Sequence, residues 1–324
     1  MKEQPLVSIP MITYNGEEYL EEQLDSIYNQ TYKNIEVLVF DDCSTDKTSE
    51  ILEKYHKSHN LTYVINKNNL GLRRNAIKSL EACSGEFIAP ADQDDVWKSK
   101  KIELLVNNIE DNILIYADST SIDPNGNILE ERYFEKFRDL IHGNNNKAFF
   151  FMNCVSAHAM LFKKELLEFI FPMPKRMFYH DWWIAFVAST YGSIKLYEEP
   201  LVLYRRHEHQ LTINKIKEHR LPGKGWLQRR IEKENYLKEE RYKILDILYS
   251  LSTLRILDKE TLQLLNKLIY NIEKFSSTLH NKELTKILKQ HKEEIFQMDK
   301  DKRFSRSIKK LSRGLWHYRL KFYT

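Results

Sequence analysis

Short apolar runs of strand length alternate with amphipathic segments through the first third of the chain. The apolar runs occupy four ranges, 6–12, 35–40, 61–65 and 87–91. Turn-forming residues follow them, and the helical spacing of apolar residues predicts helices after them, among them 17–29, 76–83 and 97–108. Regular alternation of strands and helices predicts βαβ units and a mostly parallel sheet, so the predicted fold class is α/β.

The pattern changes twice beyond this region. The middle of the chain predicts mixed elements: strands at 113–116 and 153–162, a hairpin turn at 123–126, an aromatic-rich helix at 179–188, and short strands at 194–197 and 201–204. Beyond Thr212 the chain is rich in Lys, Glu, Leu and Ile with helical periods. We therefore predict two parts, an α/β domain over 1–212 and an α-helical region over 213–324 that is basic at its end.

Acidic residues gather where two of the predicted strands end. Asp92, Asp94 and Asp95 lie within four residues directly after one apolar run, and Asp41 and Asp42 follow another. Carboxylates this close raise one another's pKa unless a positive charge offsets them. Divalent cations prefer oxygen ligands, and parallel strands place their carboxyl ends along one sheet edge, where ligands collect. The pattern predicts a cation or ligand site at this edge; a solvated acidic turn is the alternative.

Composition and charge argue against several classes of protein. Apolar residues make up 42% and charged residues 30% of the 324 residues, which suits a globular protein with a sizeable core. The formal net charge of +4 is small and no RNA-binding signature is present, so nucleic acid is not an expected partner. The three cysteines are far apart and form no CxxC pair, which argues against a disulfide framework and a cysteine zinc site and favours a reducing, cytoplasmic setting.

The two ends of the chain bear on membrane association. We see no signal-peptide pattern at the N-terminus and no apolar run long enough to span a bilayer. Residues 302–324 contain no acid, and Ile308, Leu311 and Leu315 fall on one helical face with cations around it. This pattern predicts that residues 302–324 either contact the inner face of the cell membrane or form a helix that packs on the preceding helical region.

Short motifs follow one another in a fixed order along the chain. They are Val7-Ser8-Ile9-Pro10 with Tyr14-Asn15, Asp41-Asp42-x-Ser44-x-Asp46, Asn69-x-Gly71, Asp92-Gln93-Asp94-Asp95-Val96-Trp97, His180-Asp181-Trp182-Trp183 and Tyr204-Arg205-x-His207. Together they resemble family 2 glycosyltransferases, and most of all the bacterial rhamnosyltransferase-like members that build surface polysaccharides. The resemblance covers about the first two thirds of the chain. It implies a GT-A fold, with a nucleotide-binding half joined to an acceptor-binding half.

The resemblance also implies the chemistry and the residues that perform it. The reaction would be inverting transfer of a hexosyl or deoxyhexosyl group from a nucleotide-diphosphate sugar, helped by Mn²⁺ or Mg²⁺. Asp94, Asp95 and His207 match metal ligands, and Asp181 matches the general base that deprotonates the acceptor hydroxyl. The residues that match donor contacts are Tyr14, Asp41, Asp42, Arg73, Arg74, Asp92 and Arg205.

The implied partners are a UDP- or dTDP-sugar donor and a saccharide or lipid-linked acceptor, and a homo-oligomer stays open. Without the resemblance, Asp181 has an alternative role as an acid at a helix N-terminus, and His207 as an ordinary surface histidine. Ala157 stands where relatives often have glycine, and Arg73-Arg74 stand where small residues are common; these departures are expected to bear on donor or acceptor choice rather than to abolish activity. The sequence does not identify the sugar, the nucleotide or the acceptor.

Other function classes have weaker support. A Rossmann-type dinucleotide-binding protein is disfavoured because no GxGxxG follows the first predicted strand. A basic membrane-binding partner protein rests only on the C-terminal cations. A catalytically weak glycosyltransferase-like subunit is the last alternative, and the presence of every expected acid argues against it.

Overall fold

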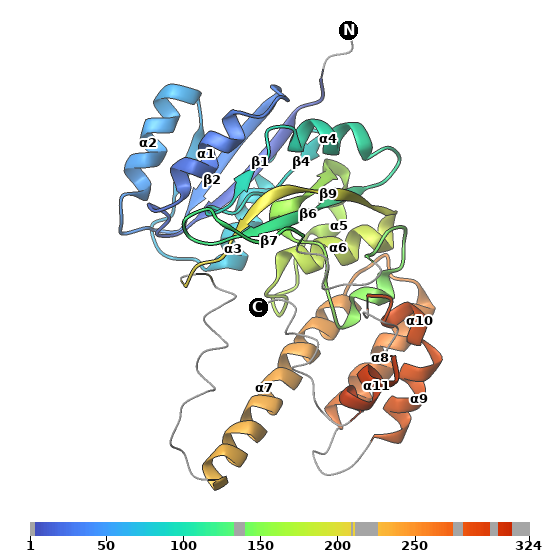
Figure 1. The fold of residues 1–324 in the computed structure, drawn as a ribbon. Helices are drawn as coiled ribbons and strands as arrows, with labels where there is room; N and C mark the ends of the chain where they lie inside the picture. The colour runs from blue at the N-terminus through green and yellow to red at the C-terminus, as the bar shows by residue number, and fades with distance from the viewer. Residues whose placement is uncertain are drawn as a thin grey trace.

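A computed structural model gives the fold and describes residues 4–132, 140–208, 210, 226–274, 281–298 and 304–312. An α/β half carries the sheet, and helices α7 to α11 lie together beside it (Figure 1). Helices flank the sheet of the α/β half. The fold is therefore α/β with helices in the C-terminal region, as predicted.

The described residues form one nine-stranded mixed sheet in the order β3-β2-β1-β4-β8-β6-β9-β5, with β7 paired to β6. The strands are β1 Val7–Thr13, β2 Ile35–Asp41, β3 Thr62–Ile65, β4 Phe87–Ile88, β5 Val96–Trp97, β6 Leu114–Ile122, β7 Ile128–Glu130, β8 Met160–Lys163 and β9 Ile194–Arg205. Strands β1 to β4 run parallel, and so do β6 and β9. Strand β8 is antiparallel to both β4 and β6, and it joins these two parallel groups.

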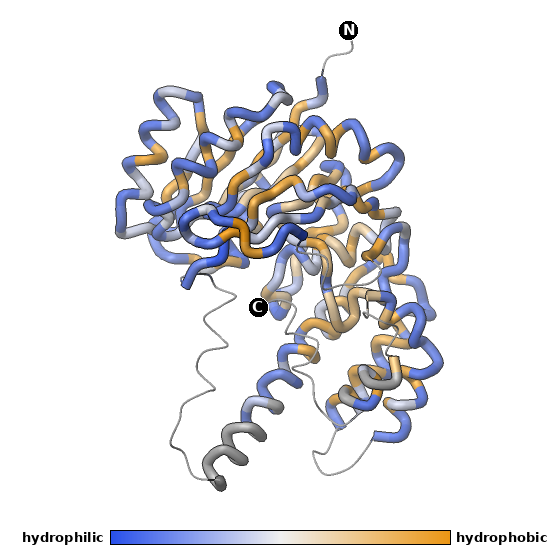
Figure 2. Tube along the Cα trace, viewed as in Figure 1, coloured by the Kyte–Doolittle hydropathy of each residue, from blue (hydrophilic) through white to orange (hydrophobic). Residues whose placement is uncertain are grey.

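The helices of the α/β half follow the apolar spacing of the sequence. They are α1 Leu20–Tyr28, α2 Thr48–His59, α3 Leu72–Glu81, α4 Lys101–Asn108, α5 Leu167–Ile170 and α6 His180–Tyr191. In α1 the apolar residues Leu20, Leu24 and Ile27 are buried, whereas Glu21 and Glu22 are exposed. Apolar residues run along the strands of the sheet (Figure 2). Burial on both faces explains why the parallel strands read as continuous apolar runs.

A small hollow lies beside β1, lined by Pro10, Ile12, Asp92, Ala157 and His180 among others, and we call it the crevice beside β1. From β1 the chain passes to β2 and β3 on one side, and β4 pairs with β1 on the other side. In such sheets ligands bind outside the carboxyl ends of the strands where the order reverses. Thr13 Oγ1 at the end of β1 donates to Asp41 Oδ1 at the end of β2, at 2.9 Å. The polar strand ends therefore meet at one edge, as the sequence predicts.

Three predicted strands differ from the structure. The predicted strand at 153–162 is instead a 3₁₀ turn, η3 Ala157–Ala159, followed by the shorter strand β8. The two strands predicted at 194–197 and 201–204 form the single strand β9. Its pairing with β6 shifts register around Asp118, opposite Pro200. A register shift accommodates Pro200, which has no N–H to give to the ladder, so the chain does not need to break the strand there.

The C-terminal helices share a core with the α/β half. They are α7 Trp226–Ser252, α8 Lys259–Glu273, α9 Lys282–Gln290, α10 Lys292–Ile295 and α11 Phe304–Leu311. One continuous apolar cluster joins Trp182 and Phe186 of α6 to Leu248 of α7 and to Ile308 and Leu311 of α11. The predicted boundary at 212/213 lies outside the described residues, so the division into two parts stays a prediction.

The predicted membrane face of residues 302–324 is only partly described. Ile308 and Leu311 are buried in the shared core, which favours the packing alternative for this part of the segment. Leu315 lies outside the described residues. Among the described helices, none has the length and apolar character needed to cross a bilayer.

Candidate active site

The acidic turn between β4 and β5 lies at the crevice beside β1. The N–H of Ala91, at the start of this turn, donates to the carbonyl of Pro10 in β1 at 3.0 Å. The Gln93 side chain bridges back to the end of β1, because its Oε1 accepts from Tyr14 N at 2.9 Å and its Nε2 donates to Tyr14 O at 3.2 Å. These contacts hold the three acids of the turn against the strand end.

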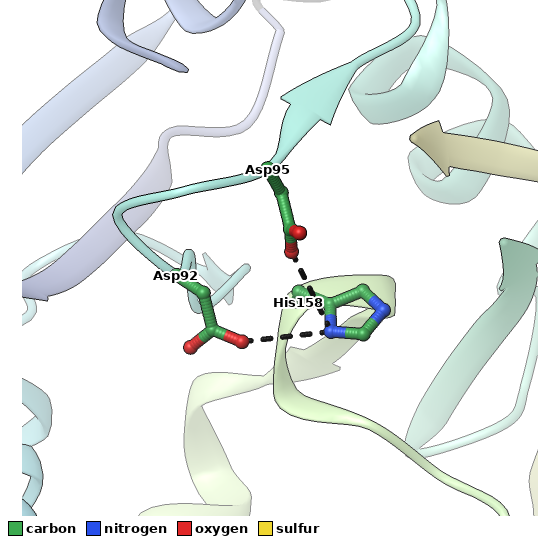
Figure 3. A group of neighbouring side chains, drawn as sticks. All are labelled: Asp92, Asp95 and His158. Carbon is green, nitrogen blue, oxygen red and sulfur yellow. Dashed lines mark ion pairs between the residues drawn. The ribbon is translucent and has the colours of Figure 1, made fainter. Parts of the chain in front are cut away.

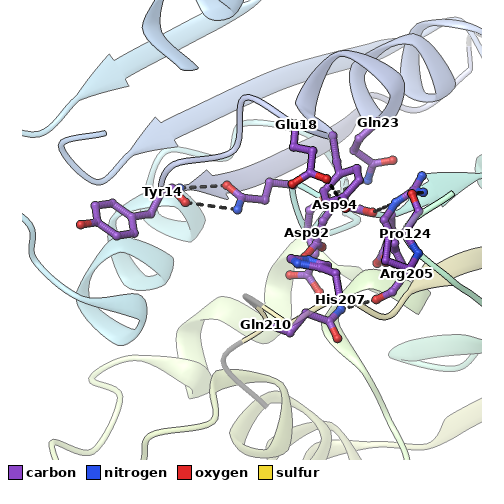
Figure 4. A network of polar contacts seen from close by, with 12 residues as sticks. Tyr14, Glu18, Gln23, Asp92, Asp94, Pro124, Arg205, His207 and Gln210 are labelled. Carbon is purple, nitrogen blue, oxygen red and sulfur yellow. Dashed lines mark hydrogen bonds and ion pairs between the residues drawn. The ribbon is translucent and has the colours of Figure 1, made fainter. Parts of the chain in front are cut away.

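Asp94 and His207 form one pair of candidate ligands. His207 Nε2 lies 2.8 Å from Asp94 Oδ2, and both side chains are largely buried (Figure 4). His207 follows the end of β9, so this contact joins residues that are far apart in the chain. The His207 ring also packs on Tyr19, with ring centroids 5.0 Å apart.

Arg205 fixes the backbone on both sides of this pair. Its guanidinium donates from Nε to Asp94 O at 2.9 Å and from Nη1 to Pro124 O at 2.9 Å, and it pairs through Nη2 with Glu22 Oε2 at 2.5 Å. The guanidinium carbon also lies 4.6 Å from the centroid of the Tyr19 ring. Arg205 is buried and each of its guanidinium nitrogens has a protein partner. Its predicted role as a donor contact stays a prediction.

Asp92 and Asp95 face a histidine that sequence reasoning missed. His158 Nδ1 lies 3.5 Å from Asp92 Oδ2 and 3.6 Å from Asp95 Oδ2 (Figure 3). Burial, together with the charges of Asp94 and Asp92, raises the pKa of Asp95 to about 8. Burial also acts to raise the pKa of Asp92, but the contact with His158 outweighs it and leaves that pKa below its ordinary value. The two carboxyls therefore differ in their readiness to ionise.

Asp181 stands in the first turn of α6, and the structure gives it an unusual pKa. Burial raises the pKa of this carboxyl to about 7, and the negative charge of Asp92 acts in the same direction. The N–H of Trp182 donates to Asp181 Oδ1 at 2.7 Å and opposes that shift. Neighbouring His180 lines a small hollow together with Asp92 and Ala157. A carboxyl with a pKa near neutrality at the edge of the acidic turn has the properties of a general base.

The residues predicted to contact the nucleotide lie at the ends of β1 and β2. Asp42 is buried and accepts from the N–H groups of Leu70 and Gly71 at 2.7 and 2.8 Å, so it shapes the loop before α3. Asp41 is also buried and accepts from Thr13 and Ser44. Tyr14 is 49% exposed, which leaves its ring accessible to a planar ligand. All three stay predicted donor contacts.

Arg73 and Arg74 differ in their surroundings. Arg73 donates from Nε to Pro174 O at 3.2 Å and from Nη2 to Met173 O at 3.1 Å, so it ties the first turn of α3 to the segment before α6. Arg74 is exposed. The structure therefore shows a structural contact for Arg73, and the predicted donor contact of either residue stays a prediction.

The donor set of the acidic turn fits a hard divalent cation. Asp95 is fully buried, and its Oδ2 has no hydrogen-bond partner among the described residues. Carboxylate oxygens with one imidazole nitrogen are a suitable set for Mn²⁺ or Mg²⁺. Two groupings lie side by side: Asp94 with His207, and Asp92 with Asp95 and His158. The sequence grouped Asp94, Asp95 and His207, whereas the structure turns Asp95 toward His158.

Several residues of the site carry no recognisable signal in the sequence. His158 lies in a buried apolar segment, where a lone histidine is usually structural. Lys101, which is buried and donates from Nζ to the His158 carbonyl, has the sequence context of an ordinary surface lysine in a helix. Glu22 and Tyr19 occupy α1 and the residue before it, far in sequence from their partner Arg205. Glu22 and Tyr19 can be identified as site residues only from the folded structure, where α1, β9 and the acidic turn are in contact.

Comparison with known proteins agrees with this geometry. The family described as "Glycosyl transferase family 2" matches residues 8–171. An uncharacterized glycosyltransferase of Methanocaldococcus jannaschii is 32% identical over 228 residues, which cover 68% of this chain and 77% of the relative. The chain belongs to glycosyl transferase family 2. It is therefore a glycosyltransferase.

Other relatives and solved structures have the same fold or family. An uncharacterized glycosyltransferase of Haemophilus influenzae is 32% identical over 65% of this chain and 69% of its own. Chondroitin synthase of Escherichia coli is 30% identical over 41% of this chain, but over only 20% of the synthase. The crystal structure of S. aureus TarS 1–349 in complex with UDP-GlcNAc matches with a TM-score of 0.58 and 18% identity, over 98% of this chain and 88% of that one. At this identity the match supports the GT-A fold alone.

Proposed function

We propose that this glycosyltransferase moves a hexosyl or deoxyhexosyl group from a nucleotide-diphosphate sugar to a saccharide or lipid-linked acceptor in cell-surface polysaccharide synthesis, with inversion and with a divalent cation. The observation that carries the proposal is the convergence of the acidic turn, His207 and the raised-pKa carboxyl of Asp181 on the crevice beside β1. The rhamnosyltransferase-like motifs and the polysaccharide synthase among the relatives support the substrate class.

The proposed chemistry assigns one step to each group. Asp181 accepts the proton of the acceptor hydroxyl while that oxygen forms a bond to the anomeric carbon from the face opposite the leaving group. The bond between the anomeric carbon and the diphosphate breaks, and its electron pair leaves with the diphosphate. Asp94, Asp95 and His207 would hold Mn²⁺ or Mg²⁺, whose positive charge stabilises that leaving group when bound.

The proposed donor is a UDP- or dTDP-sugar. Among solved structures of similar fold, TarS is in complex with UDP-GlcNAc, and the mannosyltransferase PcManGT of Pyrobaculum calidifontis is in complex with GDP-Man and Mn²⁺; the latter matches with a TM-score of 0.53 and 16% identity. Tyr14, Asp41, Asp42, Arg73, Arg74, Asp92 and Arg205 are the proposed donor contacts. A lipid-linked acceptor would place the reaction at the inner face of the membrane.

Donor binding with and without the cation tests the proposal. We expect UDP- or dTDP-sugars to raise the melting temperature in Mn²⁺ and to lose most of that effect in EDTA. Asp94→Asn should weaken donor affinity in Mn²⁺ far more than in EDTA, because it removes one ligand charge. Asp123→Asn, a change of the same kind in an exposed turn, is the control. Equal affinity of the wild type and Asp94→Asn under both conditions would refute the metal assignment.

A further inference from the structure

We propose that His158 is a positioning residue of the donor and cation site, which fixes the Asp92 and Asp95 carboxylates in place. The inference rests on the proposed function of the acidic turn. His158 contacts two acids of the turn, Asp92 and the predicted metal ligand Asp95. We assign it the role of holding these two side chains.

The geometry places one imidazole nitrogen between two carboxylates. Asp92 and Asp95 both point toward the His158 ring (Figure 3). Nδ1 is almost equally far from the two acids, 3.5 Å from Asp92 Oδ2 and 3.6 Å from Asp95 Oδ2. His158 is buried, and so is Asp95. A single hydrogen on Nδ1 therefore faces both carboxyl groups, in surroundings where charges interact strongly.

The other side of the ring is held by neighbouring strands. Nε2 lies 3.1 Å from Ser119 Oγ in β6. The ring stacks on Tyr204 of β9, with centroids 4.9 Å apart and an angle of 9° between the planes. Lys101 of α4 is fully buried and donates from Nζ to the His158 carbonyl at 2.6 Å. The ring and its backbone are thus fixed by three elements outside the acidic turn.

The Ser119 contact is compatible with a hydrogen on Nδ1 that faces the acids. A neutral ring with its proton on Nδ1 accepts the hydroxyl hydrogen of Ser119 at Nε2, and a protonated ring donates from both nitrogens. In both states Nδ1 carries a hydrogen toward Asp92 and Asp95. The remaining tautomer would present a lone pair to the carboxylate of Asp92, which ionises readily, and this is electrostatically unfavourable. The positioning role therefore does not depend on the charge of His158.

The same contacts connect His158 to the predicted metal ligands. Asp95 Oδ1 accepts from the N–H of Arg205 at 3.1 Å, and the chain reaches His207 two residues later. Loss of the Nδ1 hydrogen would remove the polar group that faces Asp95 Oδ2 at 3.6 Å and would loosen this connection. We favour this role over a second cation bound among Asp92, Asp95 and His158, because a hydrogen on Nδ1 leaves that nitrogen without a lone pair for a cation.

Two substitutions of similar size separate positioning from packing. Asn at 158 places an amide N–H close to the original Nδ1, whereas Leu of nearly the same volume offers no donor. We expect His158→Leu to weaken Mn²⁺ retention about tenfold, the usual scale for a residue that orients metal ligands, and His158→Asn to stay within about threefold of the wild type. Retention is measured by electron paramagnetic resonance of free Mn²⁺, with the best-binding nucleotide among UDP, dTDP and GDP.

The outcomes distinguish this inference from the proposed function. Equal retention by the Leu and Asn variants, or better retention by Leu, means that the site needs only apolar volume at 158 and overturns the inference. A wild type that retains no Mn²⁺ with any of the three nucleotides overturns the proposed function as well. Circular dichroism checks folding. If His158→Leu is unfolded, the Ser119→Ala variant replaces it in the test. We expect Ser119→Ala to weaken Mn²⁺ retention about threefold. Unchanged retention in this variant overturns the inference.

Discussion

At the scale of the residue, the site is built from carboxylates whose surroundings separate their pKa values. Asp92 ionises readily beside His158, whereas burial raises the pKa of Asp95 to about 8 and that of Asp181 to about 7. Enzymes place acids in such different environments when each has a different task. The lowered pKa suits a group that binds positive charge, and the pKa near neutrality suits a base.

The proposed base gives a direct prediction. Asp181→Asn should lower turnover by about a hundredfold or more, with donor affinity nearly unchanged, because base catalysis is lost while the donor contacts remain. In the wild type, turnover should rise with pH through about 7 as Asp181 ionises. Steady-state kinetics between pH 5.5 and 8.5, buffer values we choose to span that pKa, check both expectations. Wild-type rates in the variant would place the base at another residue.

The same raised pKa predicts a stability effect of opposite sign. The native state holds the Asp181 proton more tightly than the unfolded chain, so stability falls as pH rises from the ordinary value of 3.8 toward about 7. Asp181→Asn removes this penalty and should raise the melting temperature at pH 8 by about 2–4 °C for each kcal/mol gained. The gain should vanish near pH 4, below the folded-state pKa of about 7.

Asp258→Asn is a suitable control for this measurement, because the pKa of Asp258 is lowered and Asn also caps helices well. It should give no gain in melting temperature at pH 8. An Asp181→Asn protein that melts like the wild type at every pH would mean that Asp181 ionises as freely in the folded protein as in the unfolded chain.

At the scale of the element, loops from separate segments are tied together around the crevice. Arg73 joins the first turn of α3 to the carbonyls of Met173 and Pro174, in the segment that leads to α6 and Asp181. Arg205 joins β9 to α1 and to the acidic turn. These guanidinium groups use several donors of fixed geometry at once, which Lys does not offer.

This arrangement separates two roles for Arg73. If it positions the segment before α6, Arg73→Lys should lower turnover several-fold and leave donor affinity within about twofold, because the charge stays and the two-donor contact is lost. If Arg73 contacts the donor, as the sequence predicted, affinity should fall instead. Isothermal titration with the donor, beside turnover measurements, distinguishes the two results. Arg74→Lys at the exposed neighbouring position is the control.

At the scale of the whole molecule, the C-terminal helices are part of the main core. Ile308 and Leu311 of α11 are buried in the cluster that includes Trp182 and Phe186 of the helix bearing Asp181. Lys147 in η2 Asn146–Phe150 also pairs with Glu294 of α10 at 2.6 Å. The described part of the helical region therefore packs in the same core as α6 and is not a loosely attached tail.

Truncation tests this arrangement and the membrane hypothesis together. A chain that ends at Asp301 loses Ile308 and Leu311, each of which stabilises by about 1.5–3 kcal/mol when fully buried, so its melting temperature should fall by several degrees.

Flotation with anionic liposomes then compares the full chain with the chain that ends at Asp301. If the full chain floats and the truncated chain does not, residues 302–324 contact the membrane; if both behave alike, the segment is a packing element.

The sequence by itself determined the alternating α/β order, the parallel pairing of β1 to β4 and the acids at the strand ends, because these depend on local periodicity and on short motifs. It also predicted Asp181, Asp94 and His207 by resemblance. Only the tertiary structure decided that Asp95 faces His158 and that Arg205 reaches Glu22. Such contacts join segments far apart in the chain, and their pKa shifts come from burial, which no local pattern of residues records.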